Sequence, residues 1–104
     1  MEGGRIEALI GMLGRDPDDP MLHYLLGLES FRVGRYADAI KAIRTYLSLA
    51  EDEGAVYRTL AQSLERIGNI QEARIAYQQG IVAAGRHGHP GMVDEFEQAL
   101  RELG

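Results

Sequence analysis

Apolar side chains recur along most of this chain at the three- and four-residue spacing that is typical of amphipathic helices. The first such stripe consists of Ile6, Leu9, Ile10 and Leu13. Breaks rich in glycine, proline and acidic residues separate the stripes from one another. The pattern therefore predicts six helices and no strand. The expected ranges are about 4–14, 20–33, 36–50, 55–67, 70–85 and 90–103.

Residues at two of the breaks are suited to start a helix. Asp19 is a good N-cap, and Pro20 suits the first helical position because its missing N–H would be unpaired there in any case. Asn69 can cap the fifth helix, and Glu72, three residues later, can bond back to the backbone N–H of the cap. These signals place helix starts near residues 20 and 70.

The pattern also repeats at a spacing of 34 residues. Such a period indicates a stack of like units, each of which buries its apolar face on its neighbours. It restricts the expected function to a binding or scaffolding surface without identifying the partner. The residues that recur unchanged are Leu26, Arg32, Gly34, Ala39, Ala42 and Ala50, which return as Leu60, Arg66, Gly68, Ala73, Ala76 and Ala84.

The repeat resembles the tetratricopeptide (TPR) family, whose unit of 34 residues has the pattern W-x2-L-G-x2-Y, then A-x3-F, then P. The matching positions of the first unit hold His23, Leu26, Gly27, Ser30, Ala39 and Ile43. Those of the second unit hold Tyr57, Leu60, Ala61, Leu64, Ala73 and Tyr77. Gly34 and Gly68 would form the turn between the two helices of each unit.

The chain departs from this pattern at a few positions. His23 and Ser30 replace aromatic residues, which thins the packing at the outer helix contacts of the first repeat. Glu51 and Gly85 stand where the closing proline is expected. Gly27 keeps the small residue of the pattern, which allows the two helices of the unit to approach closely where they cross.

The resemblance implies an all-α fold of helix–turn–helix repeats wound into a right-handed superhelix, an α-solenoid. The phase extends backwards, since Ala8 and Leu9 lie 34 residues before Ala42 and Ile43. It fails forwards, because acidic residues at 94 and 95 would take the positions of Leu60 and Ala61. We expect one domain over 1–104. Its parts would be a half-repeat helix at 3–15, repeats at 20–53 and 54–87, and a capping helix at 90–103.

Composition adds several exclusions. The formal charge of −5 disfavours a nucleic-acid partner, which needs a basic face. No run approaches the ~20 apolar residues of a membrane span. The first residues lack the layout of a signal peptide, and there is no cysteine to form a disulfide. We therefore expect a cytoplasmic protein with no membrane or nucleic-acid partner.

Enzyme chemistry has little support in the sequence. There is no Gly-rich phosphate loop and no nucleophile elbow. His87 and His89 have a metal-like spacing but no third ligand nearby, so a solvated linker is favoured. The acidic clusters at 51–53 and 94–97 lack the alternating ligands of a calcium loop. We expect no catalytic activity, no cofactor and no metal.

In the family that the chain resembles, the first helix of each unit lines a concave groove that receives a peptide or a partner helix. On this sequence, the groove residues of the first unit would be Met21, Tyr24, Leu28, Phe31 and Arg32. Those of the second would be Ala55, Arg58, Gln62, Glu65 and Arg66. The first set is mostly apolar and the second mostly polar. The lysines and asparagines with which one subgroup clamps a C-terminal carboxylate are not reproduced, which disfavours that ligand.

Three functions fit these features. The chain can be an adaptor that binds a protein or peptide in the groove. It can instead associate with itself, since half-units at each end leave apolar flanks that a homodimer would cover. It can also serve a larger complex as one of its subunits. The aromatic residues of the groove set have a plainer explanation as well, which is that they pack on one another.

Overall fold

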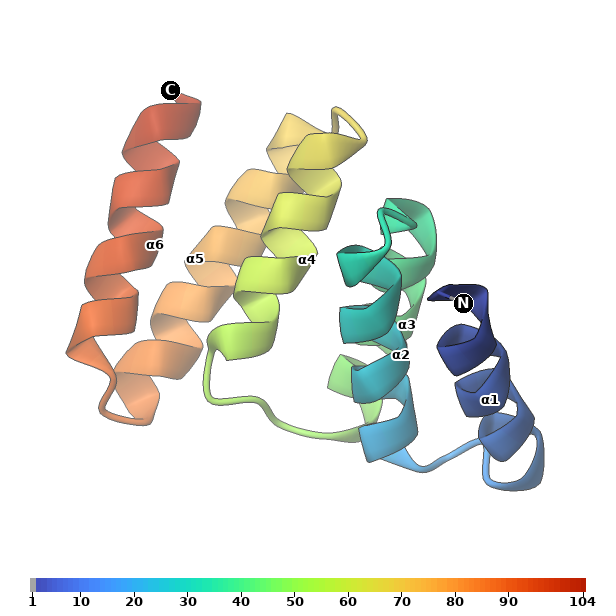
Figure 1. The fold of residues 1–104 in the computed structure, drawn as a ribbon. Helices are drawn as coiled ribbons and strands as arrows, with labels where there is room; N and C mark the ends of the chain where they lie inside the picture. Colours follow the sequence, from blue (N-terminus) through green and yellow to red (C-terminus); the bar gives the residue numbers. More distant parts are fainter. Residues whose placement is uncertain (1) are drawn as a thin grey trace. The chain divides into compact units, whose positions relative to one another are not determined.

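The computed structural model describes residues 2–104, which form six helices and no strand (Figure 1). The helices are α1 (Glu2–Arg15), α2 (Pro20–Arg32), α3 (Tyr36–Leu49), α4 (Ala55–Arg66), α5 (Ile70–Arg86) and α6 (Pro90–Leu103). The expected ends differ from these bounds by no more than two residues. The all-α fold with adjacent, paired helices is therefore confirmed.

The helices form two compact units, which we describe separately. The first unit, Met1–Glu51, contains α1, α2 and α3, and the second, Asp52–Gly104, contains α4, α5 and α6. Within the units, α2 packs on α3 and on α1, while α5 packs on α4 and on α6. The single domain over 1–104 and the superhelical winding concern both units together, and they stay predictions.

Two helix starts have the expected caps. The Asp19 carboxylate accepts a hydrogen bond from the backbone N–H of Met21 at 2.9 Å, and Pro20 is the first residue of α2. The Asn69 side chain accepts from the backbone N–H of Glu72 at 3.3 Å. Both caps satisfy donors that the helix itself leaves unpaired.

The turns after α2, α4 and α5 share one hydrogen-bond pattern. In the first, the Arg35 N–H donates to the Ser30 carbonyl at 2.8 Å, and the Gly34 N–H donates to the Phe31 carbonyl at 3.0 Å. This is the Schellman arrangement, which places a residue with positive φ after the helix. Gly34 and Gly68 have φ of +83° and +84°. The turn before α6 repeats the arrangement although the 34-residue phase has ended there.

In the first unit, a small residue lets α2 and α3 come together. A Cβ on Gly27 would lie 2.6 Å from Cγ1 of Ile43, so the Ile43 side chain packs directly on the α2 backbone. Ile43 is completely buried, as is Ala39 one turn before it. The apolar stripe of α1 contributes Ile6, of which only 2% is exposed. The core of this unit therefore runs through all three helices.

In the second unit, α6 closes the core. Phe96 is completely buried, and its ring tilts against Tyr77 with centroids 5.8 Å apart. Gly80 on α5 makes room for this ring, since a Cβ there would lie 2.6 Å from Phe96 Cε2 and 2.9 Å from Tyr57 Cβ. The last helix thus covers α5, as expected of a capping helix.

None of the helices within residues 2–104 has the length and apolar character needed to cross a membrane.

Candidate functional site

The predicted groove residues of the first unit lie along one side of α2. We call Met21, Tyr24, Leu28 and Phe31 the α2 strip; their spacing places them on neighbouring turns. Met21 is 55% exposed, and the other three are half-buried. The structure therefore brings these four apolar side chains together at a surface of the unit.

Helix α3 holds the two aromatic rings of the α2 strip in place. The Tyr24 ring meets the Tyr46 ring edge to face, with centroids 5.2 Å apart. The Phe31 ring meets the Tyr36 ring in the same way at 5.6 Å. Such contacts are favourable aromatic geometries. The rings thus pack on their neighbours, as the plainer explanation expected, and still keep part of their surface open.

One exposed residue of this surface was missed by the sequence reasoning. Leu25 is 41% exposed and lies one turn after Met21 and one turn before Leu28. Met21, Leu25, Leu28 and Arg32 follow the i, i+4, i+7, i+11 spacing of one helix face. The signal was present in that spacing, but the family's groove positions skip Leu25.

At the C-terminal end of α2, Arg32 pairs with a carboxylate of its own helix. Its guanidinium donates to Glu29 Oε1, with Nη2 2.5 Å away. Glu29 is only 7% exposed although it is charged. The hydrogen bond from Arg32 lowers the pKa of the Glu29 carboxyl and keeps it ionised. One end of the apolar surface therefore carries an ion pair, in which the charge of Arg32 is balanced by that of Glu29.

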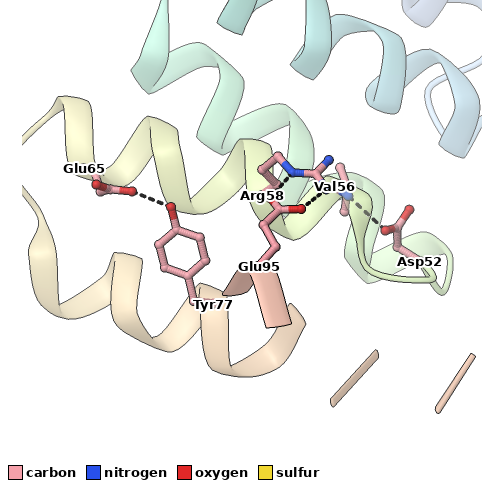
Figure 2. A network of polar contacts seen from close by, with 6 residues as sticks. All are labelled: Asp52, Val56, Arg58, Glu65, Tyr77 and Glu95. Atoms are coloured by element: carbon pink, nitrogen blue, oxygen red, sulfur yellow. Dashed lines mark hydrogen bonds and ion pairs between the residues drawn. The ribbon is translucent and has the colours of Figure 1, made fainter. Parts of the chain in front are cut away.

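The predicted groove residues of the second unit behave differently, because α6 engages one of them, Arg58 (Figure 2). Arg58 donates two hydrogen bonds to Glu95, at 2.5 Å from Nε and 2.6 Å from Nη2. Its guanidinium also lies 5.7 Å from the centre of the Phe96 ring. The hydrogen bonds raise the pKa of Arg58 and lower the pKa of the Glu95 carboxyl. This fork geometry fixes the guanidinium in one orientation.

Glu65 has a partner within the unit as well. The Tyr77 hydroxyl of α5 donates to Glu65 Oε2 at 2.6 Å (Figure 2). Burial, and then this hydrogen bond, raise the pKa of Tyr77 above its ordinary value. Gln62 lies half-buried between Arg58 and Glu65 on α4. Arg58 is therefore held by α6 and Glu65 by α5, within the second unit.

Acidic residues and a histidine that the sequence offers as candidates for ion binding also have structural contacts. The Asp52 carboxylate accepts from the N–H groups of Gly54 at 2.9 Å and Val56 at 3.0 Å, and so caps α4. His89 Nε2 lies 2.7 Å from Glu53 Oε1. Among residues 2–104, no three His, Asp or Glu side chains gather in a way that could hold a metal ion. The absence of a metal stays a prediction.

The structure thus gathers Met21, Tyr24, Leu28 and Phe31 in one unit, and Arg58, Gln62 and Glu65 in the other. A shared groove lined by both sets depends on how the units are placed, and it stays a prediction. The sequence missed Glu95 as the partner of Arg58. Its only signal was the acidic cluster at 94–97 in a helix that closes the repeats.

Comparison with known proteins agrees with this architecture. No protein-family model matches the chain. Over 98 residues it is 26% identical to TPR repeat-containing protein PA0015 of Pseudomonas aeruginosa, covering 94% of this chain and 93% of that protein. The solution structure of protein BPP2914 from Bordetella parapertussis superimposes with a TM-score of 0.78 at 26% identity, covering 94% of this chain and 85% of that one. The resemblance to TPR proteins is confirmed.

Proposed function

We propose that the chain is a non-catalytic protein–protein interaction module that binds an amphipathic helix or extended segment of a partner on the α2 strip. Its similarity to a TPR repeat-containing protein supports an interaction module. The absence of catalysis, cofactors and nucleic-acid binding, and a cytoplasmic location, stay predictions.

The observation that carries the proposal is the open apolar surface of α2. Met21 and Leu25 are among the most exposed large apolar residues of the first unit, and Leu28 continues the surface along the helix. Contiguous exposed apolar patches mark interaction sites more often than scattered apolar residues do. The anchored rings of Tyr24 and Phe31 lose little conformational freedom on binding, which favours affinity.

The polar residues of α4, which are Arg58, Gln62 and Glu65 (the α4 set), belong to the second unit and are considered separately. A partner carboxylate that approached Arg58 would have to share it with Glu95, which already accepts two of its hydrogen bonds. Such a contact sets the orientation of the partner more than its affinity. We therefore assign the binding energy to α2, and a role of Arg58, Gln62 and Glu65 in orienting the partner stays a prediction.

The test begins with affinity capture of partners by the whole chain, followed by mass spectrometry. The recovered partner is then titrated against Leu28→Glu, which places a charge in the α2 strip and leaves Gly27 unchanged. Binding is expected to weaken at least about tenfold. Val82→Glu is the matched control, because it adds the same charge at a highly exposed apolar residue, which is 60% exposed on α5. A folded Leu28→Glu protein with wild-type affinity would refute the site.

Self-association is the second candidate, and α1 favours it. Ile10 and Met12 of α1 are 52% and 45% exposed, and as residues two positions apart they lie on different sides of the helix. A second copy could cover the side that carries Ile10 in a symmetric contact. Light scattering over a range of concentrations would reveal a dimer. Ile10→Glu would then abolish the dimer, whereas Leu28→Glu would leave it intact.

A further inference from the structure

A cleft of about 270 Å³ opens within the first unit, and residues from all three of its helices line it. Its walls are mostly apolar, with charged residues of α3 and of the position just before it at the rim. There Arg35 pairs with Asp38 at 2.8 Å, and Lys41 lies one turn further along α3. The lining residues used below are Ile6 and Leu13 from α1, His23, Leu26 and Ser30 from α2, and Ala42 from α3.

The Ser30 hydroxyl in this lining has no hydrogen-bond partner among the protein atoms. Ser30 is completely buried, and its Oγ is the one such buried side-chain atom in the part of the chain described. Ser63 of the second unit is equally buried, but its hydroxyl donates to the Thr59 carbonyl at 2.7 Å. Buried hydroxyl groups are nearly always paired, so an unpaired one calls for an explanation.

The repeat explains how the cleft arises. Ser30 is equivalent to Leu64, a larger apolar side chain that is 2% exposed. His23 is equivalent to Tyr57, and its Nε2 lies 2.7 Å from the Pro17 carbonyl oxygen, so its ring is held at the α1–α2 turn. Both substitutions remove apolar volume from the same place. The cleft is therefore lined at two positions by smaller or more polar side chains than the second repeat has.

We propose that this cleft binds the aromatic side chain of a partner protein that ends in a hydrogen-bonding group, a tyrosine or a tryptophan. The cleft is smaller than the roughly 300–1,000 Å³ of sites for drug-sized ligands, so it suits one side chain rather than a cofactor. Apolar walls such as Ile6 and Leu13 suit the ring. Ser30 is completely buried, so the entering side chain must open the cleft as far as its Oγ. The hydroxyl can both donate and accept, so it can then pair with a phenolic O–H or an indole N–H.

This site is distinct from the α2 strip. Leu26 and Ser30 point to the interior side of α2, whereas Leu28 is on the half-exposed side, so a partner can use either surface without the other. The proposal therefore does not rest on the function proposed above. The failure of one leaves the other standing, provided that each is tested with its own variant.

The test titrates the ¹⁵N-labelled whole chain with N-acetyl-tyrosinamide and follows the amide signals by NMR. N-acetyl-phenylalaninamide is the matched control probe, since it differs only by the hydroxyl. The expected result is a set of shifts confined to the cleft lining. The tyrosine probe should bind about fivefold more tightly, the scale of one net hydrogen bond. Equal binding of both probes, or shifts located elsewhere, would overturn the proposal.

Three variants sharpen the result. Ser30→Leu inserts the residue found at position 64 and should abolish binding while raising the melting temperature. Ser30→Ala keeps the space without the hydroxyl, so both probes should bind equally; it adds no bulk and decides the matter if Ser30→Leu does not fold. Leu28→Glu should bind the tyrosine probe as wild type does. Unchanged preference for tyrosine in Ser30→Ala would contradict the proposed role of Ser30.

Discussion

The two units start from the same repeat and treat equivalent positions in opposite ways. On the partly exposed side of α2, Tyr24 and Leu28 present apolar surface. Arg58 of α4, which is equivalent to Tyr24, is hydrogen-bonded to Glu95 instead. In the interior, Ser30 lines a cleft, whereas its equivalent in the second unit is the larger, buried Leu64. At these equivalent positions, the first unit leaves apolar surface and a cleft open, whereas the second unit has an ion pair and a larger buried side chain.

The helix added to each repeat accounts for much of this difference. Helix α6 brings Phe96 into the core and Glu95 to Arg58, so the second unit is closed by both an apolar and an ionic contact. Helix α1 brings Ile6 into the core but leaves Ile10 half-exposed. We expect the second unit, which α6 covers, to contribute more to the stability of the fold. We expect the first unit, which keeps apolar surface exposed, to bind a partner.

The largest effect is expected from Phe96→Ala. Phe96 is completely buried, so its truncation should lower the free energy of unfolding by about 3 kcal/mol. Phe31→Ala, the only other phenylalanine in the chain, is the matched control. It removes a half-exposed ring and should cost clearly less. Chemical denaturation of both variants measures the difference, and equal losses would remove the contrast between a closed and an open unit.

A smaller loss is expected from Gly80→Ala. The new methyl group would lie 2.6 Å from the Phe96 ring and 2.9 Å from Tyr57 Cβ, which is fixed to the backbone and cannot rotate away. Overpacking on this scale costs about 1–3 kcal/mol, and the better helix propensity of alanine returns up to about 1 kcal/mol. Gly85→Ala on the same helix, where a Cβ would meet nothing within 4 Å, should be neutral or stabilising. A stabilised Gly80→Ala protein would show that α6 does not press on α5.

Leu28→Glu tests the open unit with an expected effect of about 1.4 kcal/mol on partner binding, the equivalent of tenfold in affinity. Its melting temperature should change little, because Leu28 is only half-buried. Gln62→Glu, at the equivalent position of α4, places the same charge in the closed unit. It should weaken binding less, and equal losses in both variants would show that the two units share the binding energy.

The smallest effect concerns the ion pair between Arg58 and Glu95. Hydrogen bonds from Arg58 lower the pKa of Glu95 in the folded state, so the pair stabilises the protein at pH values above the ordinary carboxyl pKa. This contribution is lost as the pH falls through the lowered pKa. Because both side chains are more than a third exposed, we expect less than about 1 kcal/mol. Denaturation of wild type and Glu95→Gln should differ at neutral pH and converge in acid; Glu97→Gln, exposed on the same helix, should show no such trend.

The fold could be predicted from the sequence because its signals are local and repeated. The 34-residue phase and the caps at Asp19 and Asn69 fixed the helices to within two residues. The contacts of the α4 set could not be predicted, since Arg58 and Glu95 are 37 residues apart and meet only after α5 has folded between them. The residue type at a groove position does not reveal whether its charged side chain forms an ion pair within the protein. The sequence predicts thin packing at His23 and Ser30. It does not predict that the Ser30 hydroxyl is buried without a hydrogen-bond partner.

Two kinds of glycine in this fold imply two kinds of mutational tolerance. At Gly34 and Gly68 a Cβ would meet nothing within 4 Å. Glycine is favoured there only because the backbone has a positive φ. In a library of all substitutions, asparagine should survive best there, because it adopts left-handed conformations most readily after glycine. At Gly27 glycine is favoured because a larger side chain would collide with Ile43, so the restriction depends on the residue at position 43. Larger residues at 27 should therefore be recovered only with a smaller residue at 43, so that these two positions change together over generations while each turn changes alone.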